Sequence, residues 1–279
     1  MSNKSKRDTF FFIVVLITFL LLYSKTIIWL GSRWYNDEDY SHGPLIPLVS
    51  GYLIWIKRDK LKQIELSTNI VGLYLLIVSL LIHVFSIRAE VSFTSAYSLI
   101  LSTAGIVLYF FGRNLFNEVI FPIGYLVFMV PFFQFIIDPL SNKLKLFSAY
   151  LSAEIIDLAG IPVYRDGVML HLATGSLEVA NPCSGIRSII SLLALGTIFS
   201  YFSTTTMTNR ILLVCSTIPL AVVGNLARIV FSGVMTNAGI DVTTGFIHTL
   251  TGLIVFAVAF AGLIGVRKLL IWKSEIKNI

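Results

Sequence analysis

Long apolar runs separated by short polar stretches follow one another along most of the chain. They cover residues 9–30, 43–56, 70–87, 92–111, 115–137, 184–202, 211–235 and 245–272. Most of these runs are close to the roughly 20 apolar residues that a helix needs to cross a bilayer. The run at 43–56 is short, but merging it with a neighbour would break the charge alternation along the chain. The pattern predicts an all-α polytopic membrane protein with about eight transmembrane helices.

Residues 138–182 interrupt this pattern. In 139–160, apolar residues recur at helical spacing between charged ones, which predicts an amphipathic helix at the membrane surface. Its apolar positions are Leu144, Phe147, Leu151, Ile155 and Leu158. Residues 161–180 combine turn signals with alternating apolar positions, which predicts a short β-hairpin-like segment. We therefore expect a single integral membrane domain, residues 1–279, with an outer-face insertion at about 138–182.

The composition excludes other classes of protein. Hydrophobic residues make up 56% of the chain and charged residues 13%, with a mean hydropathy of +0.85. An ordinary soluble domain has about a quarter of its residues charged, and a disordered chain has low hydrophobicity. The net charge of +6 does not indicate a nucleic-acid partner, because membrane proteins concentrate Lys and Arg in their cytoplasmic loops.

The distribution of basic residues predicts the orientation. With eight alternating helices and a cytoplasmic N-terminus, thirteen of the 21 Lys and Arg residues lie inside. They are Lys4, Lys6, Arg7, Lys57, Arg58, Lys60, Lys62, Arg113, Arg210, Arg267, Lys268, Lys273 and Lys277. Both termini are then cytoplasmic, and residues 138–182 lie on the outer side. The membrane lipid is therefore the first partner that the sequence predicts.

Three polar residues converge in this topology. Cys183 stands where the sixth predicted helix begins, at the outer face. Arg228 and His248 lie about 10 Å and 5 Å below that face on the next two helices. Taken singly, Cys183 could be a small apolar residue that fills space, Arg228 could extend its charge to the headgroups, and His248 could be a packing residue. Together they could form a site in which His248 accepts the thiol proton and Arg228 stabilises a thiolate or oxyanion.

The surroundings of Cys183 favour a reactive thiol. Cys215 lies about 20 Å deeper in the seventh predicted helix, too far for a disulfide. Asn181 and Ser184 flank the cysteine at a helix start, whose free N–H groups and dipole favour a thiolate. Arg187 is one turn further and could add positive potential, although a snorkelling role fits equally. The sequence has no metal-ligand motif and no phosphate-binding glycine loop, so we expect no cofactor.

Five stretches of the sequence resemble the exosortase and archaeosortase family. The resemblance is carried by residues 177–188 (LEVANPCSGIRS), 224–229 (GNLARI), 248–252 (HTLTG), 39–47 (DYSHGPLIP) and 160–167 (GIPVYRDG). Their order and their membrane placement make the likeness more specific than any one of them. His248 favours a bacterial exosortase over the archaeal members, which tend to carry arginine there. Asn181 stands where the family often has an acidic residue.

The resemblance implies a function. These enzymes are multi-spanning cysteine transpeptidases that act on exported proteins with a C-terminal sorting signal: a short motif such as Pro-Glu-Pro, a transmembrane helix and a basic cluster (PEP-CTERM). Bacterial members accompany exopolysaccharide production in the inner membrane. By motif match, Cys183 is the nucleophile, and Arg228 and His248 complete the site. Residues expected to bind substrate or support the site are His42, Asn181, Ser184, Arg187 and Asn225. A lipid or glycan acceptor is a possible further partner.

Two other functions account for parts of the sequence. A transporter or flippase for lipid-linked polysaccharide would explain the hydrophobicity and the intramembrane Arg228, but it predicts inverted repeats and midplane polar residues. The sequence shows no internal repeat. A non-catalytic assembly subunit would leave Cys183, Arg228 and His248 without a common explanation.

Overall fold

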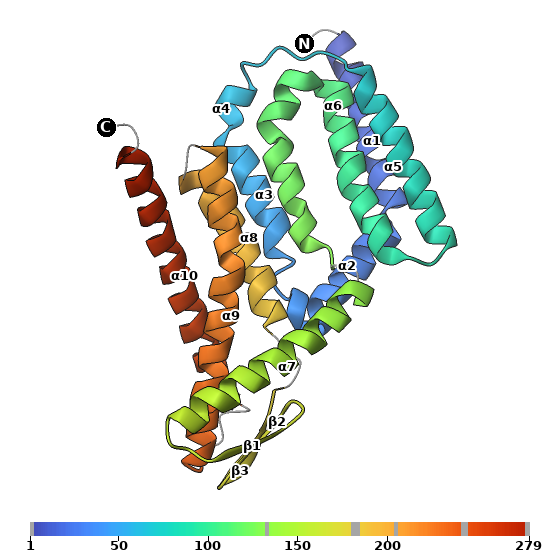
Figure 1. Cartoon of the computed structure of the whole chain (residues 1–279). Coiled ribbons are helices and arrows are strands. Elements are labelled where there is room, and N and C mark those ends of the chain that lie inside the picture. Colours follow the sequence, from blue (N-terminus) through green and yellow to red (C-terminus); the bar gives the residue numbers. More distant parts are fainter. Residues whose placement is uncertain (1–2, 132–133, 180–184, 204–205, 241–244, 277–279) are drawn as a thin grey trace. The chain divides into compact units, whose positions relative to one another are not determined.

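The computed structural model describes residues 3–131, 134–179, 185–203, 206–240 and 245–276. The chain is 81% helical, which confirms the predicted all-α class. It divides into two compact units, Met1–Phe133 (unit 1) and Gln134–Ile279 (unit 2). Each unit has its own packing and its own helices (Figure 1). The prediction of one domain over 1–279 stays a prediction.

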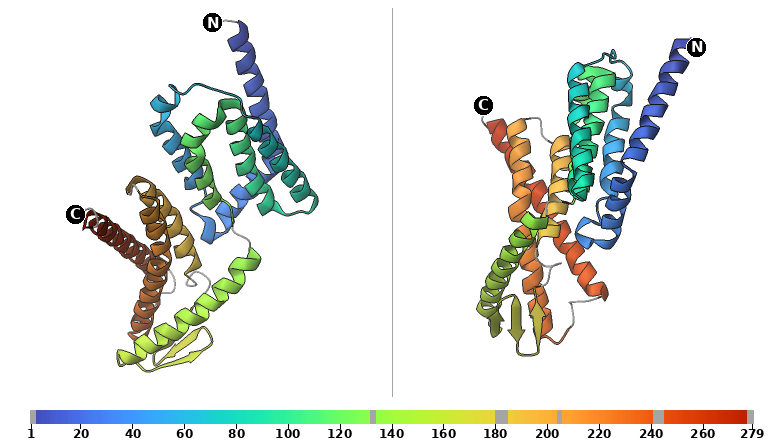
Figure 2. Two further views of the ribbon diagram at one scale, coloured as in Figure 1. Left: turned by 45° about the horizontal axis from the view of Figure 1, so that its top comes forward. Right: turned by 90° about the vertical axis from the view of Figure 1, so that its right-hand side faces the viewer.

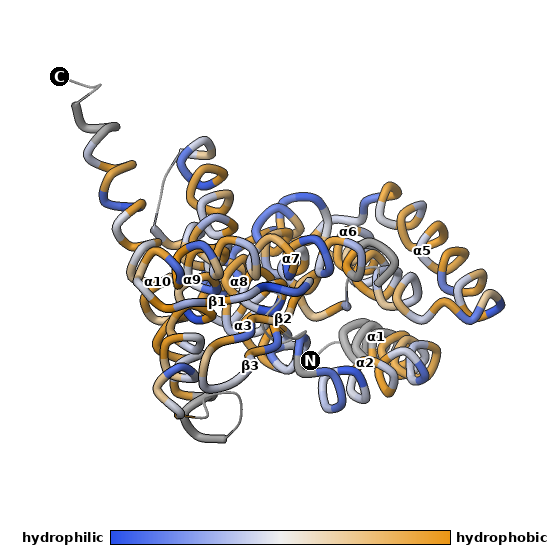
Figure 3. The backbone as a smooth tube through the Cα atoms, turned by 60° about the horizontal axis from the view of Figure 1, so that its bottom comes forward, coloured by the Kyte–Doolittle hydropathy of each residue, from blue (hydrophilic) through white to orange (hydrophobic). Residues whose placement is uncertain are grey.

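Unit 1 consists of helices that follow the apolar runs of its sequence. They are α1 (Asn3–Leu22), α2 (Ser24–Asn36), η1 (Glu38–Tyr40), α3 (Leu45–Ile56), α4 (Arg58–Leu61), α5 (Ile70–Arg88), α6 (Ser92–Tyr125) and η2 (Leu126–Met129). Hydrophobic residues run along α5, and hydrophilic residues gather where it ends (Figure 3). Asn69 caps the start of α5, since its side chain accepts a hydrogen bond from the backbone N–H of Val71 (2.9 Å).

The number of spans is smaller than predicted. In the described chain, five helices are long and apolar enough to cross a membrane, or six if the bent pair α1–α2 forms one span. These candidates support a protein with several spans but not eight spans exactly. The run at 43–56 forms α3, which has only 12 residues. The runs at 92–111 and 115–137 form one candidate, Ser92–Met129, with a kink inside it.

Gly112 makes that kink. Its backbone has φ 83° and ψ 176°, a conformation that glycine adopts at little cost. A Cβ atom there would also collide with Ser67, so the position excludes other residues on two grounds. Figures 1 and 2 show α6 doubling back, with its halves side by side. The second half stops before residue 137 because Val130, which precedes Pro131, is extended (φ −92°, ψ 128°).

The first predicted helix, 9–30, is broken at Tyr23, where α1 and α2 meet at a bend of 58°. A break inside the membrane frees backbone carbonyls, which then need other donors. His83 of α5 donates from Nε2 to the carbonyl of Leu22 (3.3 Å), and Ser24 donates to the carbonyl of Leu21 (2.8 Å). Two side chains thus hydrogen-bond the backbone carbonyls at the bend, and one of these side chains lies on another helix.

Unit 2 combines three long helices with a surface layer. Its elements are α7 (Gln134–Leu158), β1 (Val163–Asp166), β2 (Met169–Leu172), β3 (Gly175–Glu178), α8 (Ile186–Ser203), α9 (Met207–Asn237) and α10 (Gly245–Ile276). The last three are candidate spans and agree closely with the runs predicted at 184–202, 211–235 and 245–272. α9 contacts both α8 and α10.

The predicted hairpin-like segment is confirmed and is larger than expected. Its three strands form an antiparallel sheet in the order β1-β2-β3. Val163 pairs with Leu172, and Leu172 pairs in turn with Gly175. Gly167 forms the first turn with φ 59°. At the second turn, the Thr174 hydroxyl is shared between the carbonyls of Thr236 (2.7 Å) and Asn237 (2.9 Å), at the end of α9.

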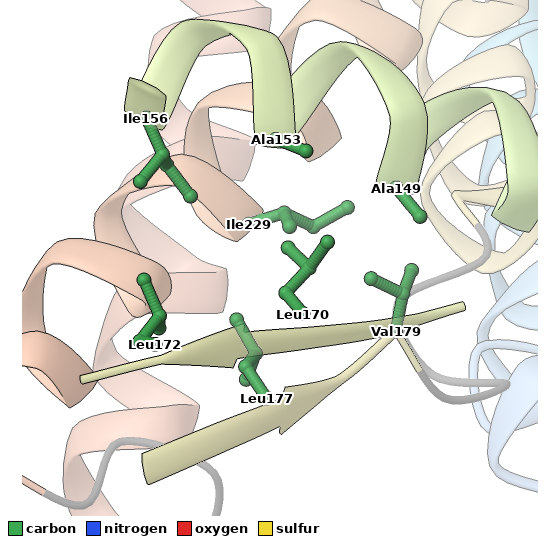
Figure 4. Close-up of a cluster of buried hydrophobic side chains, with 8 residues drawn as sticks. All are labelled: Ala149, Ala153, Ile156, Leu170, Leu172, Leu177, Val179 and Ile229. Carbon is green, nitrogen blue, oxygen red and sulfur yellow. The ribbon is translucent and has the colours of Figure 1, made fainter. Parts of the chain in front are cut away.

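The core of this layer lies between α7, the sheet and α9 (Figure 4). Its buried residues are Ala149, Ala153, Ile156, Leu170, Leu172, Leu177, Val179 and Ile229. The predicted amphipathic helix therefore exists, but it packs through small residues and Ile156. The apolar positions singled out in the sequence, such as Phe147 and Leu158, are not in this core, and these two are exposed.

Candidate active site

The middle of α9 carries two of the predicted site residues. Asn225 and Arg228 are three residues apart, which places them on the same side of the helix. Asn225 is 2% exposed and Arg228 is partly buried. Neighbouring Gly224 lets α10 approach, since a Cβ atom at this position would lie 3.0 Å from Cγ1 of Val255. A carboxamide and a guanidinium are thus enclosed among the long helices of unit 2.

Asn225 lies against the chain that enters α8. A Cβ atom on Gly185 would be 3.2 Å from Nδ2 of Asn225. Gly185 also has φ 84°, so both its conformation and its space require glycine. It is two residues beyond Cys183 in the sequence. The contact therefore joins the arginine motif on α9 to the end of the nucleophile motif.

Arg228 lies against α10. A Cβ atom on Gly252 would be 3.7 Å from Nη1 of Arg228. Gly252 follows His248 by four residues in α10, or about one helical turn. This second contact joins the arginine motif to the histidine motif. One side of α9 consequently touches chain from both of the other motifs.

The remaining predicted residues fall in different parts of the chain. Cys183, Asn181 and Ser184 lie outside the described residues, as does the side chain of His248. Arg187 is in the first turn of α8 and is partly buried. The second cysteine, Cys215, is a free, exposed thiol.

His42 belongs to unit 1, between η1 and α3. Its ring is partly buried and lies 6.3 Å, between centroids, from that of Tyr40. The other predicted site residues belong to unit 2. The structure thus brings Asn225 and Arg228 close to residues that neighbour Cys183 and His248 in the sequence. His42 is described only as part of unit 1.

Two glycines were missed as functional positions by sequence reasoning, although both stand inside the recognised motifs. Gly185 leaves room for Asn225, since a Cβ atom there would lie only 3.2 Å from Nδ2, and Gly252 lies in ordinary contact range of Arg228, at 3.7 Å from Nη1. The available signal was a glycine within a helical or helix-entry motif, where it lowers stability unless packing requires it. Their partners, however, lie 40 and 24 positions away in the sequence, beyond the reach of a local pattern.

The chemistry of this arrangement is hydrogen-bond donation to an anion. A guanidinium offers five N–H donors and a carboxamide two. In a site that excludes water, such fixed donors stabilise developing negative charge far more than they would in water. Among the described residues, no group of three or more His, Cys, Asp or Glu side chains could hold a metal ion. The absence of a metal remains a prediction.

Fold and site together define a multi-pass helical membrane protein with a polar centre between its long helices. A comparison with family models narrows this class. The transmembrane exosortase model matches residues 34–265, and the chain belongs to that family. Exosortases are cysteine transpeptidases. No curated protein and no solved structure matched the chain.

Proposed function

We propose that the protein is a membrane-embedded cysteine transpeptidase or hydrolase that cleaves C-terminal sorting signals from exported proteins. Its substrate would carry a PEP-CTERM-like signal: a short motif, a transmembrane helix and a basic cluster. Family membership supports the reaction type, and the motif match supports the substrate class. The proposed setting is protein sorting that accompanies exopolysaccharide production in the inner membrane.

In the proposed reaction, His248 takes the proton of the Cys183 thiol, and the thiolate attacks the scissile carbonyl carbon. Arg228 and Asn225 donate hydrogen bonds to the oxyanion of the tetrahedral intermediate. The carbon–nitrogen bond then breaks as His248 returns its proton to the leaving amine, and a thioester remains. Water, or an amine on a lipid or glycan, attacks the thioester and frees Cys183.

The observation that carries this proposal is the pair of contacts made by one side of α9. Asn225 lies against Gly185, in the nucleophile motif, and Arg228 lies against Gly252, in the histidine motif. Three stretches far apart in the sequence thus meet around two hydrogen-bond donors. We propose supporting or substrate-binding roles for the remaining predicted residues: His42, Asn181, Ser184 and Arg187.

The arrangement of each unit supports a site on the outer side. In unit 1, the N-terminal end of α1, α4 and the turn of α6 lie at one end (Figure 1). The first two segments carry several Lys and Arg residues, and the third carries Arg113. In unit 2, the C-terminal end of α10 lies at the end opposite the sheet (Figure 1). Because cytoplasmic ends collect basic residues, we propose that both termini are cytoplasmic and that the sheet is external.

The first test compares the two cysteines. Cys183→Ala should abolish processing of a co-expressed substrate that ends in a helix and a basic cluster, whereas Cys215→Ala should leave it unchanged. Both variants should insert into the membrane to wild-type levels. Mass spectrometry of the new C-terminus identifies the cleavage position and shows whether water or an amine acceptor was used. Normal processing by Cys183→Ala would overturn the assignment and leave a transporter or an assembly subunit as the alternatives.

A second test addresses Asn225. As an oxyanion donor, it should contribute to kcat rather than to KM, and Asn225→Ala should lower kcat about 10²–10³-fold, the loss seen when one such donor is removed. Asn225→Gln keeps the donor but misplaces it, so it should also be slow. Labelling of Cys183 by a membrane-impermeant thiol reagent serves as the structural control. Unchanged labelling with unchanged kcat would rule out the donor role.

A further inference from the structure

Helix α7 has two apolar sides, one buried within unit 2 and the other partly exposed. Ala149, Ala153 and Ile156 are buried against the sheet and α9 (Figure 4). A second set of apolar residues runs along the helix: Leu140, Leu144, Phe147, Leu151, Ile155 and Leu158. Phe147 is 49% exposed and Leu158 is 86% exposed. This set is here called the α7 stripe.

Helical geometry separates the two sides clearly. At 3.6 residues per turn, the stripe occupies an arc of about 80°, and the three buried residues point about 170° away from its centre. Polar residues border the stripe on both flanks, with Lys143 and Glu154 on one and Ser148 and Ser152 on the other. The sheet therefore covers the side of α7 that faces away from the stripe.

The position of α7 within unit 2 points to what covers the stripe. The helix has 25 residues but is not among the candidate spans found in the described chain. It crosses α9 obliquely, near the end that carries the sheet (Figures 1 and 2). Helix α9 is itself a candidate span. Helix α7 thus lies at a slant to α9 and reaches the end of unit 2 that carries the sheet. An apolar stripe in that position meets the boundary between lipid headgroups and acyl chains.

The chemistry along the stripe fits lipid better than a second protein. Six side chains in one row, most of them half covered, offer far less than the roughly 800 Å² per partner of a stable protein interface. Beside the row, the guanidinium of Arg165 lies 5.7 Å from the ring centroid of Tyr150. Tyrosine and basic side chains gather at the headgroup level of membranes.

We propose that the α7 stripe is immersed in the membrane interface and that the sheet lies on the water side of α7. The partner is phospholipid, bound along about 27 Å of helix from Leu140 to Leu158. Because Leu170 and Leu177 pack on the opposite side of α7, this contact fixes the height of the sheet above the membrane. The proposal concerns lipid contact alone and holds whether or not Cys183 is a nucleophile.

Single spin labels on α7 test the proposal. In a background of Cys183→Ala and Cys215→Ala, cysteines replace Phe147 or Leu158 on the stripe, and Glu154 or Asp157 beside it, all of them exposed positions. The labelled full-length protein is reconstituted into phosphatidylcholine–phosphatidylglycerol vesicles. Power saturation then measures collision with oxygen, which concentrates in lipid, and with a water-soluble nickel chelate.

Labels at Phe147 and Leu158 should collide with oxygen several-fold more than with nickel. The ratio should reverse at Asp157, which points about 120° away from the centre of the stripe, whereas Glu154, at the edge of the stripe, should give an intermediate ratio. Nickel access at all four positions would place the stripe in water and overturn the proposal. Low collision with both reagents at Phe147 and Leu158 would also overturn it, because a protein would then cover the stripe. Circular dichroism of each labelled variant verifies that the helices remain folded.

Discussion

The interactions that stabilise the inside of unit 1 differ from those that stabilise the inside of unit 2. The inside of unit 1 is crossed by hydrogen bonds between side chains. The Tyr23 hydroxyl contacts Ser102 (2.7 Å) and Ser98 (3.1 Å), and Ser102 also contacts Ser79 (2.7 Å). His83 Nδ1 accepts from the hydroxyl of Ser95 (2.8 Å), because its Nε2 carries the proton donated to Leu22. These bonds link the junction of α1 and α2 to α5 and α6.

Unit 2 is held by small residues and apolar side chains. Beside the apolar core under α7, its helices meet at glycines. A Cβ atom at Gly262 would lie 2.8 Å from Leu220 Cδ2, and one at Gly233 would lie 2.5 Å from Ile156 Cδ1. The only atoms in the way there are ends of flexible side chains.

The difference follows from the surroundings of each unit's core. Helices in lipid gain little from burying apolar side chains, so close packing and hydrogen bonds associate them. The proposed surface layer of unit 2 faces water on one side, and there burial of Leu170 and its neighbours contributes the usual hydrophobic free energy. We therefore expect the long helices of both units to pack in lipid and the surface layer of unit 2 to pack partly in water.

The largest expected effect comes from the core of the surface layer. Leu170 is completely buried, and Leu170→Ala should lower the local free energy of unfolding by about 2–5 kcal/mol. Hydrogen exchange should accelerate in β1–β3 and α7, while peptides from α5 and α6 keep their protection. Equal acceleration in both units would show that they do not unfold separately and would break the comparison.

The next effect concerns the close approach of α5 and α6. A Cβ atom at Gly72 would collide with the backbone of Tyr109, which cannot move aside as a side chain can. Gly72→Ala should therefore destabilise unit 1 by about 1–3 kcal/mol. Gly51→Ala in α3 is the matched control, since nothing lies within 4 Å of its Cβ position. Detergent-induced unfolding measures both, and equal stability of the two variants would contradict the expected close contact.

A smaller effect is expected from one hydrogen bond in unit 1. The double-mutant cycle Tyr23→Phe with Ser102→Ala should give a coupling free energy near 0.6 kcal/mol and no more than about 1.7 kcal/mol, the range for such bonds in membranes. Tyr23→Phe with Thr103→Ala should give none, because Thr103 bonds within its own helix, to Leu99 (2.8 Å). Zero coupling in the first cycle would show that the hydrogen bond between Tyr23 and Ser102 does not contribute to the stability of unit 1.

The smallest effect is electrostatic. Glu118 contacts Lys60 (2.7 Å) and Lys57 (3.3 Å) in unit 1. Glu118→Gln should cost about 0.2–1 kcal/mol, and less in high salt. Asp59→Asn is the comparison, since Asp59 and its partner Lys62 are each 72% exposed and their pair should contribute almost nothing. A loss that salt does not reduce would indicate packing rather than charge as the role of Glu118.

The sequence predicted the elements whose causes are local. The apolar run at 70–87 forms α5, and the segment after residue 160, with its turn signals and alternating apolar positions, forms strands. The prediction from sequence was less accurate where residues far apart in the sequence contact one another. Nothing in the sequence around Tyr23 resembles a helix breaker, and His83, whose side chain bonds the carbonyl of Leu22 at the bend, is 61 positions away. The pattern also selected the largest apolar residues of α7, whereas close packing used Ala149 and Ala153.

For the candidate site, the sequence supplied the residues but not their neighbours. Asn225 and Arg228 were recognised by motif, and their shared side of α9 follows from helical spacing. Their contacts with Gly185 and Gly252 depend on how α8, α9 and α10 pack, which no local pattern contains. The height of the sheet relative to these helices likewise depends on the tertiary contact between α7 and α9.

The hydroxyl of Thr174 has a mechanical consequence. Because it holds the last carbonyls of α9, the turn between β2 and β3 is tied to the helix that carries Arg228. Nine residues, or about 13 Å, separate Arg228 from the end of that helix. A tilt of α9 in the membrane would therefore displace the sheet in the same direction. Strand β3, which leads to Cys183, would then move together with the Arg228 guanidinium.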